Sequence, residues 1–371
     1  MDTIPKLPPE ILLAIVDELA KDRKALLTLI FVSHQFHSLA LQPLYSEISF
    51  CMDWIDESLI DKLGSLARYA ESNPGMKLTA TFSFILTLHD DDSPTPFVEI
   101  GDAIKLIVPS LVAVRRLCIF MPGSVDARIL WPLAVGAPLT HLTILECSLQ
   151  SEYLRHFLNS RPALQSLRID CFRYGTWRMN RIPNKLPAGS FPPLRSLSLP
   201  LRELVYFESP LRSLTNLDLS ESGYGSPETN PETLRQMIKP FASVRALSYR
   251  KALLPSITSI LSQLPNLEYL WLKQAFVMPM IAALPSTSKL SYIRCGSPPN
   301  LNLGSALFAA LQTLMVVDIT TSPDRIYRMY RGVDNLDLLP SDHSDEWDGW
   351  WERAERAVSN AKYSVLGISR V

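Results

Sequence analysis

The sequence predicts an α/β repeat fold, in which a short N-terminal helical module precedes an irregular solenoid of strand-and-helix units bent into a horseshoe. Three observations predict it. Leucine accounts for 59 of the 371 residues. A Leu-x-x-Leu-x-Leu pattern recurs about every 25 residues over most of the chain, within the 20 to 29 residues that define leucine-rich repeats. Residues 5–50 lack this period and instead carry apolar side chains at helical spacing.

The repeats predict a solenoid over residues 113–322. In each copy the first, fourth and sixth side chains face the core, and the third, fifth and seventh face outward. Helical return segments are expected at Glu152–Leu158, Glu232–Lys239 and Ser256–Leu264, because their apolar residues are three or four apart. One unit cannot bury its own stripe, so neighbouring units must stack into a parallel sheet backed by helices. The nine copies, with conservative replacements, begin at Val114, Leu139, Leu164, Leu194, Leu214, Val244, Leu267, Leu290 and Leu311. A conventional α/β domain with leucine-rich strands remains the alternative.

Two flanking segments depart from the regular period. Residues 51–112 are expected to form linking helices and an irregular first repeat, with a strand in 78–88 and a return in 103–112. The tail at 323–371 is expected to cap the open end of the solenoid, because a terminal repeat exposes its core. A helix is predicted within this tail at Glu352–Tyr363. The three tryptophans that precede it among acidic residues leave a partner motif as the alternative.

Residues 1–50 predict a compact module of three helices. Pro8 and Pro9 suit the first turn of a helix, and a broad apolar stripe follows them. A second apolar cluster at 26–31 leads to Ser33, which is a good N-cap for a third helix that we expect to break at Pro43. The module is too small to bury such wide stripes alone.

The module resembles the F-box, the motif by which substrate receptors of SCF ubiquitin ligases dock on a Skp-type adaptor. The likeness rests on the runs Leu7-Pro8-Pro9-Glu10-Ile11-Leu12, Val32-Ser33-x-x-Phe36 and Pro43-Leu44-Tyr45. An F-box followed by irregular repeats is similar to fungal-type F-box and leucine-rich-repeat receptors. The resemblance implies a substrate-recognition subunit that binds the adaptor, and through it a cullin scaffold, while the repeats bind an unknown target protein. It implies adaptor contacts at Leu7, Pro8, Ile11, Leu12, Ile15, Val32 and Phe36. The alternatives are that these side chains only close the end of the solenoid, and that the protein is a repeat scaffold acting outside a ubiquitin ligase.

The later repeats place aromatic and basic residues at outward positions. Such residue types are enriched at interface hot spots. We therefore predict a patch that holds an acidic or phosphorylated peptide of the target. Burial of these side chains under the C-terminal tail is the alternative. The predicted substrate-binding residues are Arg250, Tyr269, Trp271, Lys273, Tyr292 and Arg294.

Other classes of function find little support in the sequence. A net charge of −1 gives no general attraction to nucleic acid or anionic membranes. No histidine or cysteine spacing typical of a metal site occurs, nor does a P-loop, GxGxxG or GxSxG motif. The five cysteines lie at least 24 residues apart and are expected to be reduced thiols. The sequence thus predicts a non-catalytic intracellular protein, cytoplasmic or nuclear, without metal or cofactor and without a membrane or nucleic-acid partner.

Overall fold

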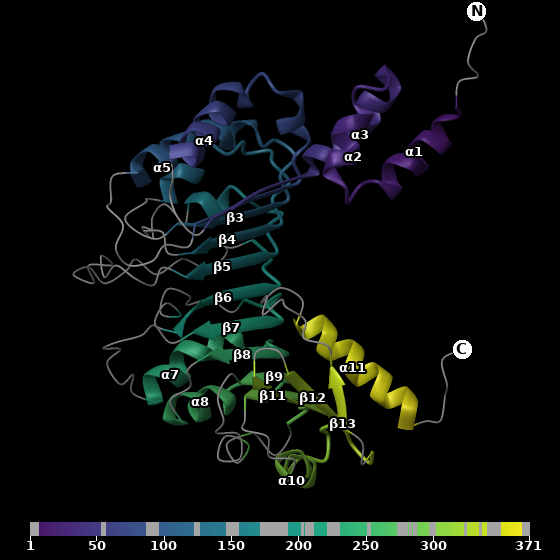
Figure 1. The fold of residues 1–371 in the computed structure, drawn as a ribbon. Coiled ribbons are helices and arrows are strands. Elements are labelled where there is room, and N and C mark those ends of the chain that lie inside the picture. Colours follow the sequence, from purple (N-terminus) through teal and green to yellow (C-terminus); the bar gives the residue numbers. More distant parts are fainter. Residues whose placement is uncertain are drawn as a thin grey trace, which may run out of the picture. The chain divides into compact units, whose positions relative to one another are not determined.

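The chain forms two compact units in a computed structural model (Figure 1). One comprises Met1–Leu164 and Arg168–Ile182, and the other Gln165–Leu167 and Pro183–Val371. The residues that the structure describes are 7–52, 57–86, 96–121, 127–145, 156–170, 192–201, 204, 211–220, 231–250, 254–272, 281, 284, 288–296, 302–322, 325–333, 336–339 and 350–365.

The first unit begins with the helical module, formed by α1 (Pro9–Glu18), α2 (Arg23–Leu29) and α3 (His34–Ser46). The predicted helix starts are confirmed, since Pro8 is the N-cap of α1 and the Ser33 Oγ accepts a hydrogen bond from the Phe36 N–H at 3.2 Å. Asp22 caps α2 in the same way, accepting from the N–H groups of residues 24 and 25. Both α1 and α2 pack on α3. These caps satisfy N–H groups that a helix start otherwise leaves without a partner.

The predicted break at Pro43 is wrong, because α3 continues through Pro43 to Ser46. Proline removes one backbone donor and crowds the preceding turn. Here the missing backbone hydrogen bond lies in the last turn of the helix. In the same turn the Ser46 Oγ donates a hydrogen bond to the Pro43 carbonyl at 2.9 Å. The continued helix also places Leu44 in the core of the module, 5% exposed. Burial of this side chain offsets the lost hydrogen bond.

The rest of the first unit is a parallel sheet with helical returns. Its paired strands are β1 (Glu47–Met52), β2 (Thr81–Leu86), β3 (Arg116–Phe120) and β4 (His141–Leu145). The returns are α4 (Glu57–Ala70), which packs on α5 (Pro96–Ile107), and the short helices η1 (Pro74–Leu78), η2 (Val108–Ser110) and η3 (Ala127–Leu130). The strand expected in 78–88 is β2. The sequence did not predict β1, which starts one repeat earlier, directly after α3.

The second unit is also built from parallel strands and helical returns, but its last two strands are antiparallel. Consecutive strands pair in parallel: β6 (Ser196–Pro200), β7 (Asn216–Ser220), β8 (Ala246–Arg250), β9 (Tyr269–Leu272), β10 (Tyr292–Gly296) and β11 (Val316–Ser322). Two antiparallel strands follow, β12 (Arg325–Tyr330) and β13 (Leu336–Leu339). The helices are α7 (Pro231–Ile238), η5 (Lys239–Phe241), α8 (Leu254–Leu261), α10 (Asn302–Ala310) and α11 (Trp350–Val365). The division between the units passes through β5 (Ser166–Asp170).

The leucines of the repeat motif are buried in the core, as the sequence predicts. In the repeat that contains β7, for example, Leu214, Leu217 and Leu219 are at most 1% exposed. The predicted helical returns at 232–239 and 256–264 correspond to α7 with η5 and to α8, whereas residues 152–155 lie outside the described ranges. The parallel strands and flanking helices are those of a leucine-rich-repeat solenoid.

The frame of the last copy is an exception. In the β10–β11 register, Tyr292 pairs with Val316, so Leu290 aligns with Leu314 and not with the predicted Leu311. Both frames satisfy Leu-x-x-Leu-x-Leu when valine and isoleucine replace leucine, but Leu314 is the one fully buried. The shift of three residues exchanges the two faces of the strand. The outward positions are therefore Val316, Asp318 and Thr320, and not Thr313, Met315 and Val317.

None of the helices in the described ranges is long and apolar enough to cross a membrane.

Candidate functional site

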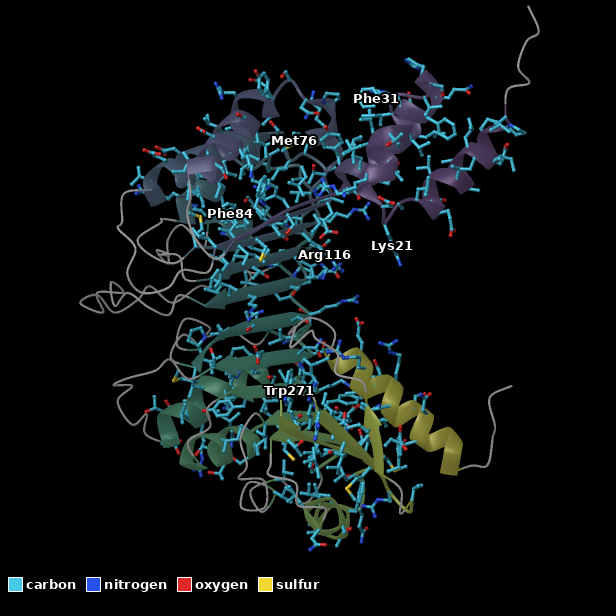
Figure 2. All side chains as sticks on the ribbon, in the orientation of Figure 1. Lys21, Phe31, Met76, Phe84, Arg116 and Trp271 are labelled. Atoms are coloured by element: carbon cyan, nitrogen blue, oxygen red, sulfur yellow. The ribbon has the colours of Figure 1, made fainter. Side chains whose placement is uncertain are left out.

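The helical module leaves large apolar side chains in contact with solvent. Phe31, in the turn between α2 and α3, is 84% exposed (Figure 2), and the others are between 45% and 61% exposed. We call this set the N-terminal apolar surface: Leu7, Ile11, Leu13, Leu27, Phe31 and Val32. It contains six of the 15 exposed large hydrophobic side chains among the described residues. Six exposed apolar side chains in one short module favour an interaction site there, whereas single exposed ones scattered over a surface are ordinary.

The residues predicted to bind an adaptor divide into two groups. Leu7, Pro8, Ile11 and Val32 are exposed, and Ile15 is half-buried. By contrast, Leu12 is only 4% exposed, and Phe36 packs against the module's own core of Val16, Leu26, Ala40 and Leu44. The second group therefore holds the module together, which a sequence motif alone does not distinguish from partner contact.

The aromatic residues of the predicted substrate patch are not exposed. Tyr269, Trp271 and Tyr292 are 3% to 7% exposed, because α11 lies across the outward face of β8 to β11 and buries them. The Trp271 and Trp350 rings meet edge to face, with 5.5 Å between their centroids. These three side chains are therefore buried under the C-terminal segment, which is the alternative that the sequence left open. In Figure 1, α7 and α8 lie on one side of these strands and α11 lies on the other.

The sequence of α11 explains its position. Its buried face carries Ala354, Ala357, Val358 and Ala361, which recur at helical spacing after Trp350. Small side chains let a helix approach bulky aromatic rings closely, so the large outward residues of the strands and the small residues of α11 fill the layer between them.

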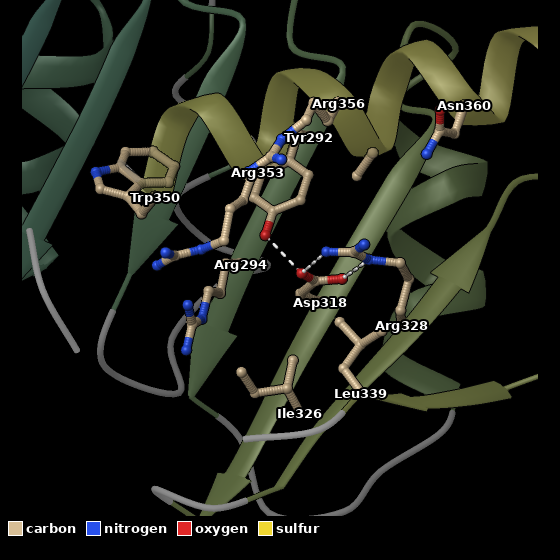
Figure 3. Close-up of a pocket in the computed structure, with 11 residues that line it drawn as sticks. Tyr292, Arg294, Asp318, Ile326, Arg328, Leu339, Trp350, Arg353, Arg356 and Asn360 are labelled. Carbon is tan, nitrogen blue, oxygen red and sulfur yellow. Dashed lines mark hydrogen bonds and ion pairs between the residues drawn. The ribbon is translucent and has the colours of Figure 1, made fainter. Parts of the chain in front are cut away.

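An ion pair between a buried carboxylate and a half-buried guanidinium lies at the edge of this layer. Arg328 on β12 donates two hydrogen bonds to the Asp318 carboxylate on β11, from Nε to Oδ1 at 2.8 Å and from Nη2 to Oδ2 at 2.7 Å (Figure 3). The Tyr292 hydroxyl donates to the same Oδ2 at 2.6 Å. Charge-assisted and bidentate bonds of this kind are the strongest that side chains form.

The surroundings shift the pKa values of the donors. Burial raises the pKa of Tyr292 well above its ordinary 10.0, and the neighbouring Asp318 carboxylate raises it further. Burial lowers the pKa of Arg328, but its hydrogen bonds to Asp318 and the charge of that carboxylate outweigh this and raise it overall. The phenol thus stays neutral and the guanidinium stays charged.

A cavity of about 310 Å³ opens between α11 and the strands beside this ion pair. On β10, Arg294 is held in place by its stack on the Trp271 ring, with Cζ 4.4 Å from the centroid, and by an Nε hydrogen bond to the Thr320 Oγ1 at 3.3 Å. From α11, Arg353 and Arg356 also line the space. We call it the arginine cavity, lined by Tyr292, Arg294, Asp318, Ile326, Arg328, Leu339, Trp350, Arg353, Arg356, Ala357 and Asn360.

Sequence reasoning found only part of this cavity. Of the predicted substrate residues it includes Tyr292 and Arg294, whereas Lys273 and the side chain of Arg250 lie outside the described part of the chain. Asp318 was missed because of the frame of the last repeat, and Arg328 because β12 was not predicted. The signal for Arg353 and Arg356 was present, since they lie three apart in a predicted helix, but the surface on which that helix packs was not. Within the described ranges, no three His, Cys, Asp or Glu side chains are grouped so as to hold a metal ion.

No family model matches the chain, and no curated protein matches it. Among solved structures, the chain is similar to one titled "Crystal structure of TLR13-ssRNA13 complex", with 15% sequence identity and a TM-score of 0.34. The match covers 75% of this chain and 36% of that one, so the chain spans about a third of the length of that structure. A similarity this low assigns no function to the chain. One repeat fold can carry many unrelated functions.

Proposed function

We propose that this leucine-rich-repeat protein is a non-catalytic substrate-recognition subunit of an SCF-type ubiquitin ligase. In this proposal the helices α1, α2 and α3 dock on a Skp-type adaptor, which connects the protein to a cullin scaffold, and the repeats bind a target protein. The resemblance of residues 7–45 to an F-box suggested it. The observation that supports it is the exposure of the N-terminal apolar surface.

Exposure bears on the choice between receptor and end cap. If the apolar side chains of the module only closed the end of the solenoid, they would be buried against the first repeat. Instead Ile11, Phe31 and Val32 are 48%, 84% and 61% exposed, while the module keeps a separate core. Covering exposed aliphatic surface contributes about 25 cal/mol per Å², so a partner that covers these side chains gains affinity from each of them.

Co-expression with a Skp-type adaptor, followed by size-exclusion chromatography, tests the proposal. We expect a one-to-one complex with the intact chain. The variant with Ile11→Asp and Val32→Asp should lose it, because each side chain contributes about 1.5 kcal/mol or more when buried, and together they change affinity by more than about a hundredfold. Both positions are exposed, so the variant should fold normally. Leu12 is unsuitable, because a charge at that buried position would disrupt the module itself.

The matched control is Val135→Asp, since Val135 is 74% exposed and lies in the same unit outside the module. It should retain the complex and the thermal unfolding midpoint of the intact chain. A folded chain that does not bind the adaptor would contradict the proposal. That result would favour a repeat scaffold that acts outside a ubiquitin ligase.

A further inference from the structure

The outward face of β8 to β11 carries residue types that bind other proteins. It presents Tyr269, Trp271 and Tyr292, and tyrosine and tryptophan are among the residues most enriched at interface hot spots. In this structure α11 covers the three rings, so the surface already has a helix as its occupant. The occupant shows the shape and chemistry of a segment that fits this face.

The end of the sheet does not need α11 as a cap. A terminal repeat exposes its core beside its last strand. Here the sheet continues past β11, because β12 pairs with β11 and β13 pairs with β12. By contrast, α11 lies across the face of four parallel strands, and the cluster that it completes includes Ala246 of β8 and Val316 of β11. This is the position of a bound helix and not of an end cap.

The strands hold this face in place by contacts of their own. The Tyr292 hydroxyl and the Arg328 guanidinium both donate hydrogen bonds to the Asp318 carboxylate. Arg294 stacks on the Trp271 ring. These contacts, like the backbone pairing of β8 to β11, join strands to one another, so the release of α11 breaks none of them. A surface that is formed in advance loses little entropy when a ligand binds.

The contact made by α11 is thin for a helix of 16 residues. Among its described side chains, those buried in this layer are Trp350, three alanines and Val358. Stabilisation by burial grows with apolar area, and alanine contributes little of it. The fit is also incomplete, because the arginine cavity of about 310 Å³ remains between the helix and the strands. A helix that places larger side chains in this space would cover more of the surface than α11 does.

We infer that the outward face of β8 to β11 binds an amphipathic helix of a partner protein, and that α11 occupies this face in cis as a competitor. The partner helix carries an aromatic residue followed by small residues three or four apart, in the pattern of Trp350, Ala354, Ala357 and Ala361. Because α11 belongs to the same chain, it competes at a high effective concentration. The inference rests on the proposed function only in treating the repeats as the part that binds a target, and it requires no adaptor.

A fluorescent peptide of residues 350–365 tests the inference by fluorescence anisotropy with the full chain. Ala354→Glu, which should release α11, is expected to bind the peptide at least about tenfold more tightly than the intact chain does. The reason is that the apparent affinity of a site falls in proportion to the fraction of molecules in which it is open. Ala309→Glu, at an exposed position of α10, makes the same chemical change and should bind like the intact chain.

Altered peptides define the chemistry that the face accepts. A peptide that itself carries Ala354→Glu should not bind the open chain, because it places a carboxylate against aromatic rings. Ser359→Glu adds the same charge outside the buried layer and should leave binding intact. A pattern peptide keeps the five buried side chains, at positions 350, 354, 357, 358 and 361, and has Gln or Lys elsewhere. It should bind like the native peptide.

Hydrogen exchange of the intact chain is a second measurement that needs no substitution. We expect the amides of α11 to exchange faster than those of β9 and β10, because local opening requires less free energy than global unfolding. An excess of the pattern peptide should accelerate the exchange of α11 further, since it displaces the helix. The peptide differs in sequence from α11, so the two are distinguished by mass.

Four results would overturn the inference. They are equal binding of the native peptide by the intact chain and a folded Ala354→Glu chain, binding that Ala354→Glu in the peptide leaves unchanged, failure of the pattern peptide to bind, and exchange of α11 only together with β9 and β10. The last result decides the matter even when Ala354→Glu does not fold. Every measurement is made without adaptor, so none depends on whether the N-terminal apolar surface binds one.

Discussion

At the scale of single residues, Asp318 organises the end of the sheet. The side chain is almost fully buried, and transfer of a carboxylate into such a site is unfavourable unless charge and hydrogen bonds compensate. Arg328 supplies the charge, and Tyr292 supplies a third hydrogen bond. Three strands, β10, β11 and β12, are connected in this way by side chains as well as by their backbones.

Asp318→Asn should destabilise the second unit by about 3 kcal/mol, because it leaves the half-buried Arg328 guanidinium without its counter-charge. Urea unfolding measures the change. Asp337→Asn, at an exposed position of β13, is the control and should change stability by less than about 0.5 kcal/mol. Equal effects of the two substitutions would show that the ion pair contributes nothing specific.

Three buried acids of the second unit make its stability depend on alkaline pH. Burial raises the pKa of the Cys295 thiol from 9.0 to about 12 and that of the Tyr269 phenol from 10.0 to about 12, and it raises that of Tyr292 well above 10.0. Each group is neutral when protonated, and the folded chain holds its proton more tightly than the unfolded chain does. The stabilisation is therefore fully present below the unfolded pKa and is lost as pH rises toward the folded one.

We expect the urea midpoint of the second unit to be constant up to about pH 9 and to fall progressively from there to about pH 12. Tyr269→Phe, which keeps the ring and removes the titrating hydroxyl, should reduce the slope above pH 10.0. A midpoint that stays constant across this range would show that these groups titrate alike in the folded and unfolded chains.

At the scale of elements, α11 determines what the outward face of the later strands can do. This face would be the natural binding surface of the repeats, yet α11 covers it over β8 to β11. The contact between α11 and the strands depends on small residues of the helix, since Ala354, Ala357 and Ala361 are each at most 3% exposed. The helix thereby converts an open aromatic surface into one wall of a basic cavity.

Ala354→Glu should release α11 from the sheet, because Ala354 is fully buried in the aromatic layer and lies outside the lining of the arginine cavity, so the substitution places a carboxylate against aromatic rings. Tryptophan fluorescence should shift to the red and become accessible to a quencher, as Trp271 and Trp350 are each 3% exposed in the intact chain. Ala309→Glu, at an exposed position of α10, makes the same chemical change and should leave the spectrum unchanged. An unaltered spectrum for Ala354→Glu would mean that α11 packs on the sheet more weakly than this burial implies.

At the scale of the whole molecule, the two candidate sites belong to different compact units and differ in chemistry. The first unit carries the N-terminal apolar surface, and the second carries the arginine cavity. The net charge of −1 shows that the cavity is a local concentration of positive charge and not a consequence of overall composition. Because each repeat contacts mainly its neighbours, we expect the two sites to respond separately to substitution.

The repeats and the starts of the helices follow from the amino-acid sequence alone. The motif places Leu214, Leu217 and Leu219 in the core, and Ser33 begins α3, because side-chain alternation along a strand and capping at a helix end are local properties. The motif could not choose between two frames of the last repeat that fit it equally well. Leu311 and Leu314 both satisfy the motif, and only pairing with β10 distinguishes them.

The candidate cavity depends on contacts between segments that are distant in the chain. The sequence identified Trp271, Tyr292 and Arg294 as outward residues, but it could not show that Trp350 and the alanine face of α11 would cover the aromatic rings. That contact joins segments far apart in the chain, and it depends on how small side chains fit large ones across a layer. Such complementarity leaves no period in the sequence, because packing energy belongs to the pair of surfaces and not to either segment alone.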